Sequence, residues 1–346
     1  MPRALTILLG IACAVIVLFG MREVASILGP VVLALVLVIA VAPVRSRLAR
    51  AGAPSWVQVV VPFLIVLLVL LGMVAVLTFS VTQLASLLPA YATQFQHLLT
   101  DAQNFAITHG ISNDQLNKAI QTFDPAKVLG LAQSLLSSLL GVLSSLFLIV
   151  VLLLAMCLDT PGIARVISAG KDTKPHLVAA VATFAHKTRR YLIVSTVFGL
   201  ICSALDVTAL SILDVPLPLL WGVLALITNY IPNIGFVLGL IPPAMLALLD
   251  GGLKQMLLVI AAYIAINVVI QSFIQPKFLG DAVGLSTTMT FLSLIVWAFV
   301  LGPLGALLAI PLSLLTRALL VDSDPSAGWA AALISGAPPE SPRSTV

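Results

Sequence analysis

The chain has 346 residues, of which 60% are apolar and only 9% are Asp, Glu, Lys or Arg. A water-soluble domain carries roughly 25% charged residues, so a surface built from this composition must face lipid over most of its area. The formal net charge of +4 does not indicate nucleic-acid binding, because the basic residues lie between hydrophobic runs and not in one patch. The composition therefore predicts an all-α membrane protein.

The hydrophobic runs, taken in chain order, predict about eight transmembrane helices, since a spanning helix needs about 20 apolar residues. The candidate spans are 5–20, 25–44, 57–79, 138–158, 191–213, 216–249, 255–275 and 288–320. The first is interpreted as a retained helix and not a cleaved signal peptide, because a second run follows almost at once. The runs 216–249 and 288–320 exceed one crossing and carry Pro and Gly near the middle, so each must be bent, broken or folded back.

The charges of the loops predict the orientation in the membrane. Arg45, Arg47 and Arg50 follow the second span with no acidic residue beside them, and the loop 159–190 is also strongly basic. The stretch 80–137 has only two lysines against three aspartates. Because basic loops stay in the cytoplasm, we expect the first two segments to be cytoplasmic and 80–137 to be external. This places the N-terminus in the cytoplasm of a bacterium, with the chain in its inner membrane.

Six regions are expected along the chain. Apolar residues recur at helical spacing over 81–99, which predicts an amphipathic helix at the start of an external helical region covering 81–137. A second such helix, 176–191, either lies on the cytoplasmic leaflet or packs on neighbouring helices. The expected regions are N-terminal spans over 1–79, the external region over 80–137, a span over 138–158, a cytoplasmic loop with an interfacial helix over 159–190, a transport core over 191–321 and a disordered tail over 322–346.

Enzyme motifs are absent from the sequence. The four histidines all lie outside the predicted spans, at His97, His109, His176 and His186. There is no HExxH pattern, no cluster of His, Cys and carboxylate residues with metal-ligand spacing, and no phosphate-binding P-loop. We therefore expect no catalytic residue, no metal and no cofactor, and a protein that is not an enzyme.

A break is predicted in the middle of the run 216–249, between Thr228 and Gly235. Pro232 has no N–H and its ring crowds the carbonyl of Thr228, so a helix cannot continue through it. The freed carbonyls must be buried in protein or line a wet cavity. With Asn229 and Asn233 beside them, they either contact a transported solute, as broken helices do in many transporters, or form a structural kink whose asparagines satisfy the backbone.

The next span carries a stripe of amides at Asn267, Gln271 and Gln275, which ends at Pro276. At about 100° per residue, positions i, i+4 and i+8 drift by only about 80° and share one helix face. Such a stripe faces either a water-filled route or a neighbouring helix, where amides act as interhelical contacts.

Asp206 is the one acidic side chain inside a predicted span. A carboxylate at the helix centre costs about 2.5–3.5 kcal/mol, which makes it a functional candidate by default. Its position two turns from the external end at Leu213 also allows local hydration. A role in proton or cation coupling is therefore a hypothesis.

The last span contains small residues and a proline with structural roles. Gly302 and Gly305 are spaced to let helix backbones approach closely, and Pro311 bends the segment. We interpret all three as helix-packing residues.

Three motifs follow one another in the C-terminal half. They are Asn229-Tyr230-Ile231-Pro232-Asn233-Ile234-Gly235, then Gln275-Pro276-Lys277-Phe278-Leu279-Gly280 leading to Gly284-Leu285-Ser286, and then Trp297 followed by Gly302 and by Gly305-Ala306-Leu307-Leu308-Ala309-Ile310-Pro311. In order and spacing they resemble the AI-2E (autoinducer-2 exporter-like) transporter family over roughly 190–320, whereas the first half agrees in layout only.

The resemblance implies a transporter and a homo-oligomer, with a pentamer expected. Members of the family are linked both to export of a quorum-sensing furanone and to sodium or lithium/proton exchange. Where relatives often have a carboxylate before the proline, this chain has Gln275, so any ion coupling is either missing or moved, with Asp206 as the candidate.

We therefore expect an exporter of a small polar metabolite or quorum-sensing signal, working around the broken helix and the polar stripe. The alternatives are a Na⁺(Li⁺)/H⁺ antiporter and a non-transporting membrane scaffold. The expected partners are membrane lipid and a small-molecule or cation substrate, with no nucleic acid. The candidate pathway residues are Asp206, Thr228, Asn229, Pro232, Asn233, Gly235, Asn267, Gln271, Gln275 and Pro276.

Overall fold

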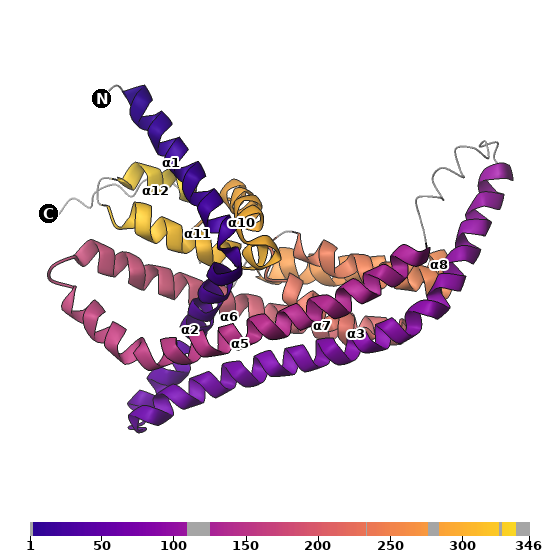
Figure 1. Cartoon of the computed structure of the whole chain (residues 1–346), viewed down its shortest axis with the longest axis horizontal. Coiled ribbons are helices and arrows are strands. Elements are labelled where there is room, and N and C mark those ends of the chain that lie inside the picture. Colours follow the sequence, from indigo (N-terminus) through magenta and orange to yellow (C-terminus); the bar gives the residue numbers. More distant parts are fainter. Residues whose placement is uncertain (1–2, 109–124, 233, 276–283, 325–326, 337–346) are drawn as a thin grey trace.

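The computed structural model describes residues 3–108, 125–232, 234–275, 284–324 and 327–336, and every regular element in these ranges is a helix (Figure 1). Six described helices are long and apolar enough to cross a membrane: Ala25–Arg50, Ser55–Leu84, Ser145–Ala169, Pro175–Ile212, Gly235–Gln271 and Thr287–Leu307. The predicted all-α membrane class is confirmed, while the count of eight spans stays a prediction.

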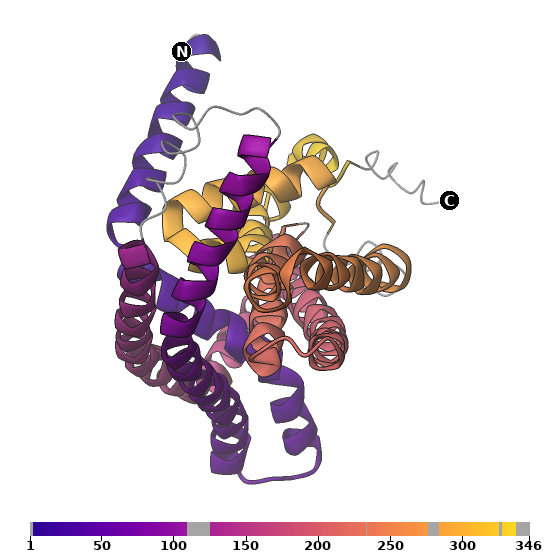
Figure 2. The same cartoon turned by 90° about the vertical axis from the view of Figure 1, so that its right-hand side faces the viewer.

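Helix α1 (Arg3–Glu23) projects from the rest of the molecule in both views (Figures 1 and 2). It contacts Phe299, over whose ring the Arg22 guanidinium lies at 4.4 Å from the centroid. Phe19 meets the same ring edge-on, with the ring centroids 5.7 Å apart. Helix α2 (Ala25–Arg50) follows after a short turn and is better buried, with Val36 only 2% exposed.

Helices α3 (Ser55–Thr108) and α5 (Pro125–Ala169) are long, continuous and side by side (Figure 1). At about 1.5 Å per residue, the 54 residues of α3 extend well over twice the thickness of a hydrocarbon core of about 30 Å. The amphipathic helix expected at 81–99 is thus a continuation of the third span, with no break at residue 80. The stretch 109–124 of the expected external region lies outside the described residues.

Helix α6 (Pro175–Ile212) includes both the expected interfacial helix and the following span. Phe184 and Tyr191 are buried in one cluster with Ile310 and Leu314. This part of α6 therefore packs on protein over its apolar face.

The long run 216–249 breaks and folds back, because α7 (Pro218–Thr228) and the first part of α8 (Gly235–Asn267) form an antiparallel pair. A Cβ on Gly235 would overlap the carbonyl of Thr228, and one on Gly239 would lie 3.4 Å from the Cα of Ala225. Farther from the break, residues of both helices share one buried cluster. The 11 residues of α7 cover about 16 Å, which is half of a hydrocarbon core.

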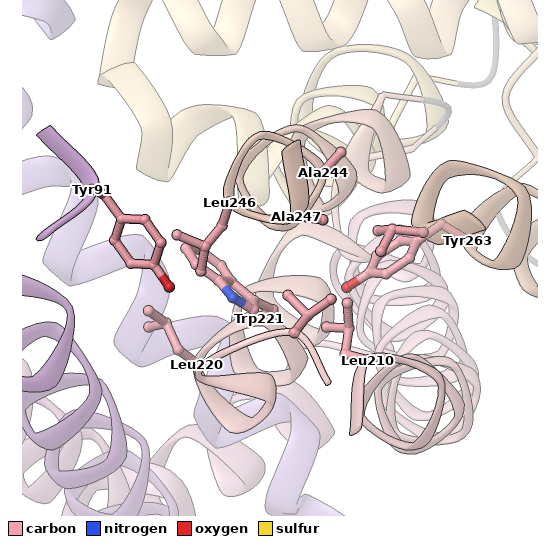
Figure 3. Packing of buried hydrophobic residues seen from close by; sticks show 10 residues of the cluster. Tyr91, Leu210, Leu220, Trp221, Ala244, Leu246, Ala247 and Tyr263 are labelled. Carbon is pink, nitrogen blue, oxygen red and sulfur yellow. The ribbon is translucent and has the colours of Figure 1, made fainter. Parts of the chain in front are cut away.

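Helix α8 itself reverses at Gly252, whose φ of 74° and ψ of −168° are not helical. Ala244 and Ala247 before the turn share a cluster with Val259 and Tyr263 after it. Figure 3 shows the labelled alanines and Tyr263 projecting from two different helical segments toward the same core. The π-helix η1 (Val268–Ile274) continues from the end of α8.

The run 288–320 also folds back. Helix α10 (Thr287–Leu307) turns at Gly302 (φ 66°), and α11 (Ala309–Arg317) returns alongside it. The Ser293 hydroxyl donates to the Ala309 carbonyl at 3.0 Å, and a Cβ on Gly305 would overlap the Trp297 carbonyl.

Two further elements follow α11. The π-helix η3 (Ala318–Asp322) extends it, and α12 (Gly328–Ser335) forms within the tail expected to be disordered. The Ser286 amide donates to the Ile334 carbonyl at 3.0 Å, and Gly336 ends the helix with a positive φ of 70°. The helix is therefore held to the chain segment just before α10, which explains why this part of the tail is ordered.

Candidate functional site

A polar cavity lies between α6, α7, α8 and η1. Its empty space is about 240 Å³, and it is lined by Cys202, Asp206, Ala225, Asn229, Phe236, Gly239, Tyr263, Asn267 and Gln271. Four of these side chains are among the pathway residues expected from sequence: Asp206, Asn229, Asn267 and Gln271. Much of this space is open to solvent, and the part that water can occupy holds about one molecule. Typical ligand pockets are far larger, so a solute can enter this cavity only if its helices move apart.

Three amides connect the break after α7 to the helices around it. Asn229, which caps the C-terminus of α7, donates from Nδ2 to the Ser195 carbonyl of α6 at 3.0 Å. Gln271 donates from Nε2 to Asn229 Oδ1 at 3.1 Å and to Asn267 Oδ1 at 2.8 Å. Asn267 donates in turn to the Tyr263 carbonyl at 2.9 Å. A connected network of this kind fixes its members in one arrangement.

The π-helix changes which residues share the face of the amide stripe. Asn267 is the last residue of α8, and Gln271 lies inside η1. In a π-helix the hydrogen bonds run from i to i+5, so 100° per residue no longer holds. Gln275 is not among the residues that line the cavity, and Pro276 lies outside the described residues.

Asp206 and Tyr263 bring two unpaired oxygens to the cavity. Each side chain is 1% exposed, and neither Asp206 Oδ1 nor Tyr263 Oη has a hydrogen-bond partner among the described residues. Asp206 is therefore buried by protein, although its distance from the helix end allowed a hydrated position. A buried polar atom without a partner costs about 1–3 kcal/mol and more when charged, and such groups inside membrane spans mark functional sites.

The backbone freed by the break is satisfied within the protein. The Tyr191 hydroxyl donates to the Tyr230 carbonyl at 2.7 Å, and the Tyr230 hydroxyl is 2.6 Å from Thr196 Oγ1. The Ile231 amide donates to the Thr228 carbonyl at 2.8 Å. A backbone amide and a tyrosine of α6 thus satisfy these two carbonyls, whereas the structural alternative assigned the broken backbone to the asparagines. The Asn229 side chain bonds instead to Ser195 and Gln271. Asn233 lies outside the described residues, and Pro232 begins the return turn toward Gly235.

Sequence reasoning missed Tyr263, although the signal was present. Tyr263, Asn267 and Gln271 are spaced at i, i+4 and i+8. The polar stripe therefore begins about one helical turn before Asn267, which is where it was predicted to begin. Cys202, Phe236 and Gly239 carry no such signal, because their place at the cavity depends on helix contacts distant in sequence.

The fold and this cavity define a multi-pass helical membrane protein with a polar site between broken helices. A family model described as "AI-2E family transporter" matches residues 6–322. The chain therefore belongs to the AI-2E transporter family, and the expected resemblance is confirmed.

Relatives of known name agree with this assignment. The chain is 32% identical over 317 residues to "AI-2 transport protein TqsA" of Escherichia coli K12, covering 91% of each chain. It is 28% identical to a "Putative transport protein" of Haemophilus influenzae over 94% of this chain and 95% of the relative. It is also 28% identical to "Putative transport protein YhhT" of E. coli K12 over 89% of this chain and 88% of the relative. All three names refer to transport, two of them as putative, which favours transport over a scaffold role.

Proposed function

We propose that this chain exports a small polar metabolite or quorum-sensing signal of the autoinducer-2 kind through the cavity between α6, α7 and α8. The observation that carries the proposal is the amide network at the break, where Gln271 bridges Asn229 and Asn267. Amides are both donors and acceptors, so they can exchange bonds with one another for bonds to a hydroxylated solute. The name of the E. coli relative, an AI-2 transport protein, supports this class of cargo.

Transport requires the cavity to open to each side in turn. The pair formed by α7 and the first part of α8 is a candidate moving unit, because Leu217 (φ 60°) precedes it and Gly252 (φ 74°) follows it. Hinges absorb backbone changes at a few residues that end an element. Movement of this pair would separate Asn229 from Gln271 and expose the amides.

The test is release of a loaded furanone signal from proteoliposomes containing the purified protein. Asn267→Leu combined with Gln271→Leu should abolish release while membrane insertion stays intact. The matched control is Gln275→Leu, which removes the amide that does not line the cavity and should release solute as the wild type does. If the double variant released solute at the wild-type rate, the amide stripe would serve only the packing of helices and not transport.

A second candidate function, Na⁺(Li⁺)/H⁺ exchange, is favoured by the unpaired Oδ1 of Asp206. A buried carboxylate facing a polar cavity can take up a proton or a cation alternately. In proteoliposomes under an imposed pH gradient, Na⁺- or Li⁺-driven proton movement should then be lost in Asp206→Asn. Asp172→Asn, in the exposed turn before α6, should leave it unchanged. Proton movement that survives Asp206→Asn would remove this carboxylate from the ion path.

We further propose that the protein is a homo-oligomer, with a pentamer as the expected state, in the bacterial inner membrane with a cytoplasmic N-terminus. The loop charges support the orientation. Exposed apolar side chains along α1, such as Leu8 and Ile16 at 64% and 70%, provide surface for lipid or for a second copy. Mass measurement of the protein in mild detergent tests the assembly, and cysteine labelling of the N-terminus in whole cells tests the orientation.

A further inference from the structure

A second cavity lies between α2, α3 and α5, near the turn that joins α2 to α3 and away from the amide network. It is partly open to the surface and is lined by Val38, Val41, Ala42, Arg45, Gln58, Pro62, Cys157 and Thr160. Arg45 is the one charged residue of this lining. It lies one to two helical turns from the end of α2 at Arg50.

One nitrogen of the half-buried Arg45 guanidinium lacks an acceptor. Its Nε is buried and has no hydrogen-bond partner among the described residues. The other hydrogen-bonding side chains of the lining donate to backbone carbonyls: Gln58 Nε2 to the Ala53 carbonyl at 2.8 Å, and Thr160 Oγ1 to the Met156 carbonyl at 2.7 Å. The lining contains no carboxylate, so no residue of the lining compensates the positive charge.

The surroundings of the cavity combine apolar surface with basic residues. Leu154 and Leu158, on either side of Cys157 along α5, are 39% and 59% exposed. Arg47 and Arg50 are exposed at the adjoining end of α2. An apolar surface that leads to a basic end matches the acyl chains and the headgroup of a phospholipid.

We propose that this cavity binds the phosphate group of an anionic phospholipid, with the Arg45 guanidinium as its donor and the acyl chains against the exposed leucines of α5. A guanidinium presents a planar fork of N–H groups that matches phosphate oxygens. The loop charges place this end of α2 at the cytoplasmic leaflet, where basic pockets between helices bind anionic headgroups. The site is independent of the solute cavity, and its test does not depend on transport.

The experiment measures lipid retained by the full-length protein purified in mild detergent, followed by titration with phosphatidylglycerol and, separately, phosphatidylcholine. Wild type should bind phosphatidylglycerol in preference to phosphatidylcholine. Arg45→Gln, which removes the charge, should weaken phosphatidylglycerol binding by about tenfold or more, as expected for loss of a charge-assisted contact. Ala42→Leu, which fills the cavity and keeps the charge, should weaken it similarly. Arg47→Gln removes one exposed charge from the same helix end and should bind as the wild type does.

Several results would overturn the proposal. Equal binding by Arg45→Gln and wild type would show that the guanidinium does not hold the headgroup. If Arg47→Gln and Arg45→Gln lost phosphatidylglycerol binding to the same extent, the lipid would be held by general electrostatic attraction to the basic end of α2 and not by the cavity. Equal affinity for phosphatidylcholine would assign binding to the acyl chains alone. If inorganic phosphate without lipid raised the unfolding temperature of the wild type but not of Arg45→Gln, the cavity would be a site for a free anion and not for a lipid.

Discussion

Asp206 on α6 and Tyr263 on α8 line the same cavity, and each has a buried oxygen that no described residue hydrogen-bonds. Both side chains are 1% exposed, so neither oxygen is satisfied by bulk solvent. A fold selected for stability alone would fill these positions with apolar side chains. Unpaired polar groups that lower stability are common at functional sites, which supports the proposed role of this cavity in transport.

Asp206→Leu should stabilise the protein. The substitution removes a buried carboxylate that lacks a partner and should raise the free energy of unfolding by about 1–3 kcal/mol. Thermal unfolding in detergent, followed by tryptophan fluorescence, measures the change. Asp172→Leu, at an exposed position, should change stability by less than about 0.5 kcal/mol. A lower unfolding temperature for Asp206→Leu would mean that Asp206 makes a stabilising contact in the folded protein.

Gly235→Ala should destabilise the pair formed by α7 and α8. A Cβ at this position would overlap the Thr228 carbonyl, which belongs to the backbone and cannot rotate away. Overpacking of this kind costs about 1–3 kcal/mol, and sometimes more. Gly72→Ala is the matched control, because a Cβ there has no neighbour within 4 Å and alanine favours a helix by about 0.5–1 kcal/mol. Comparable unfolding temperatures for the two variants would contradict the close approach.

The break at Pro232 was predictable because it follows from the chemistry of one residue. The direction of the chain after the break was not predictable, because the same local sequence is compatible with a kinked helix and with a reversal of the chain. Reversal depends on the contact of Gly235 and Gly239 with α7, which links residues that only the folded chain brings together. The same holds for Gly302, which sequence marked for close packing and the structure places at a turn with a positive φ.

The amide stripe was predicted in part. Asn267 and Gln271 do meet, but Gln275 does not line the cavity with them. The chain becomes a π-helix at Val268, so the α-helical spacing that predicted a shared face no longer holds. No periodicity in the sequence indicates where that change begins. The pairing of Asp206 with Tyr263 also escapes sequence reasoning, because it depends on α8 reversing at Gly252.

Ser313→Ala should weaken the turn formed by α10 and α11. Ser313 Oγ accepts a hydrogen bond from Trp297 Nε1 at 3.0 Å and also contacts the Ser293 hydroxyl. Loss of the hydroxyl would leave the indole N–H of a side chain only 8% exposed without its acceptor, at a cost of about 1–3 kcal/mol. Denaturant unfolding measures this loss. Ser323→Ala, whose exposed hydroxyl bonds only locally to the Leu319 carbonyl, is the control and should unfold as the wild type does.

Tyr91 and Asp250 should make stability fall at alkaline pH. The Tyr91 hydroxyl, on α3 beyond its membrane-spanning part, donates to Asp250 Oδ1 at 3.2 Å, next to the turn of α8. Burial, together with the negative charge of Asp250, raises the pKa of Tyr91 from 10.0 to about 12.

Because the folded state holds the Tyr91 proton more tightly than the unfolded state, the stabilisation is fully present below pH 10 and is lost as the pH rises toward 12. Tyr91→Phe removes this titration, so the unfolding temperature of the wild type should fall more steeply than that of the variant between these pH values. Below pH 9 the two curves should run parallel, with the variant less stable by about 1 kcal/mol for the lost hydrogen bond. Curves that stay parallel up to pH 12 would show that Tyr91 titrates alike in the folded and unfolded states, and that α3 does not hold the α8 turn through this contact.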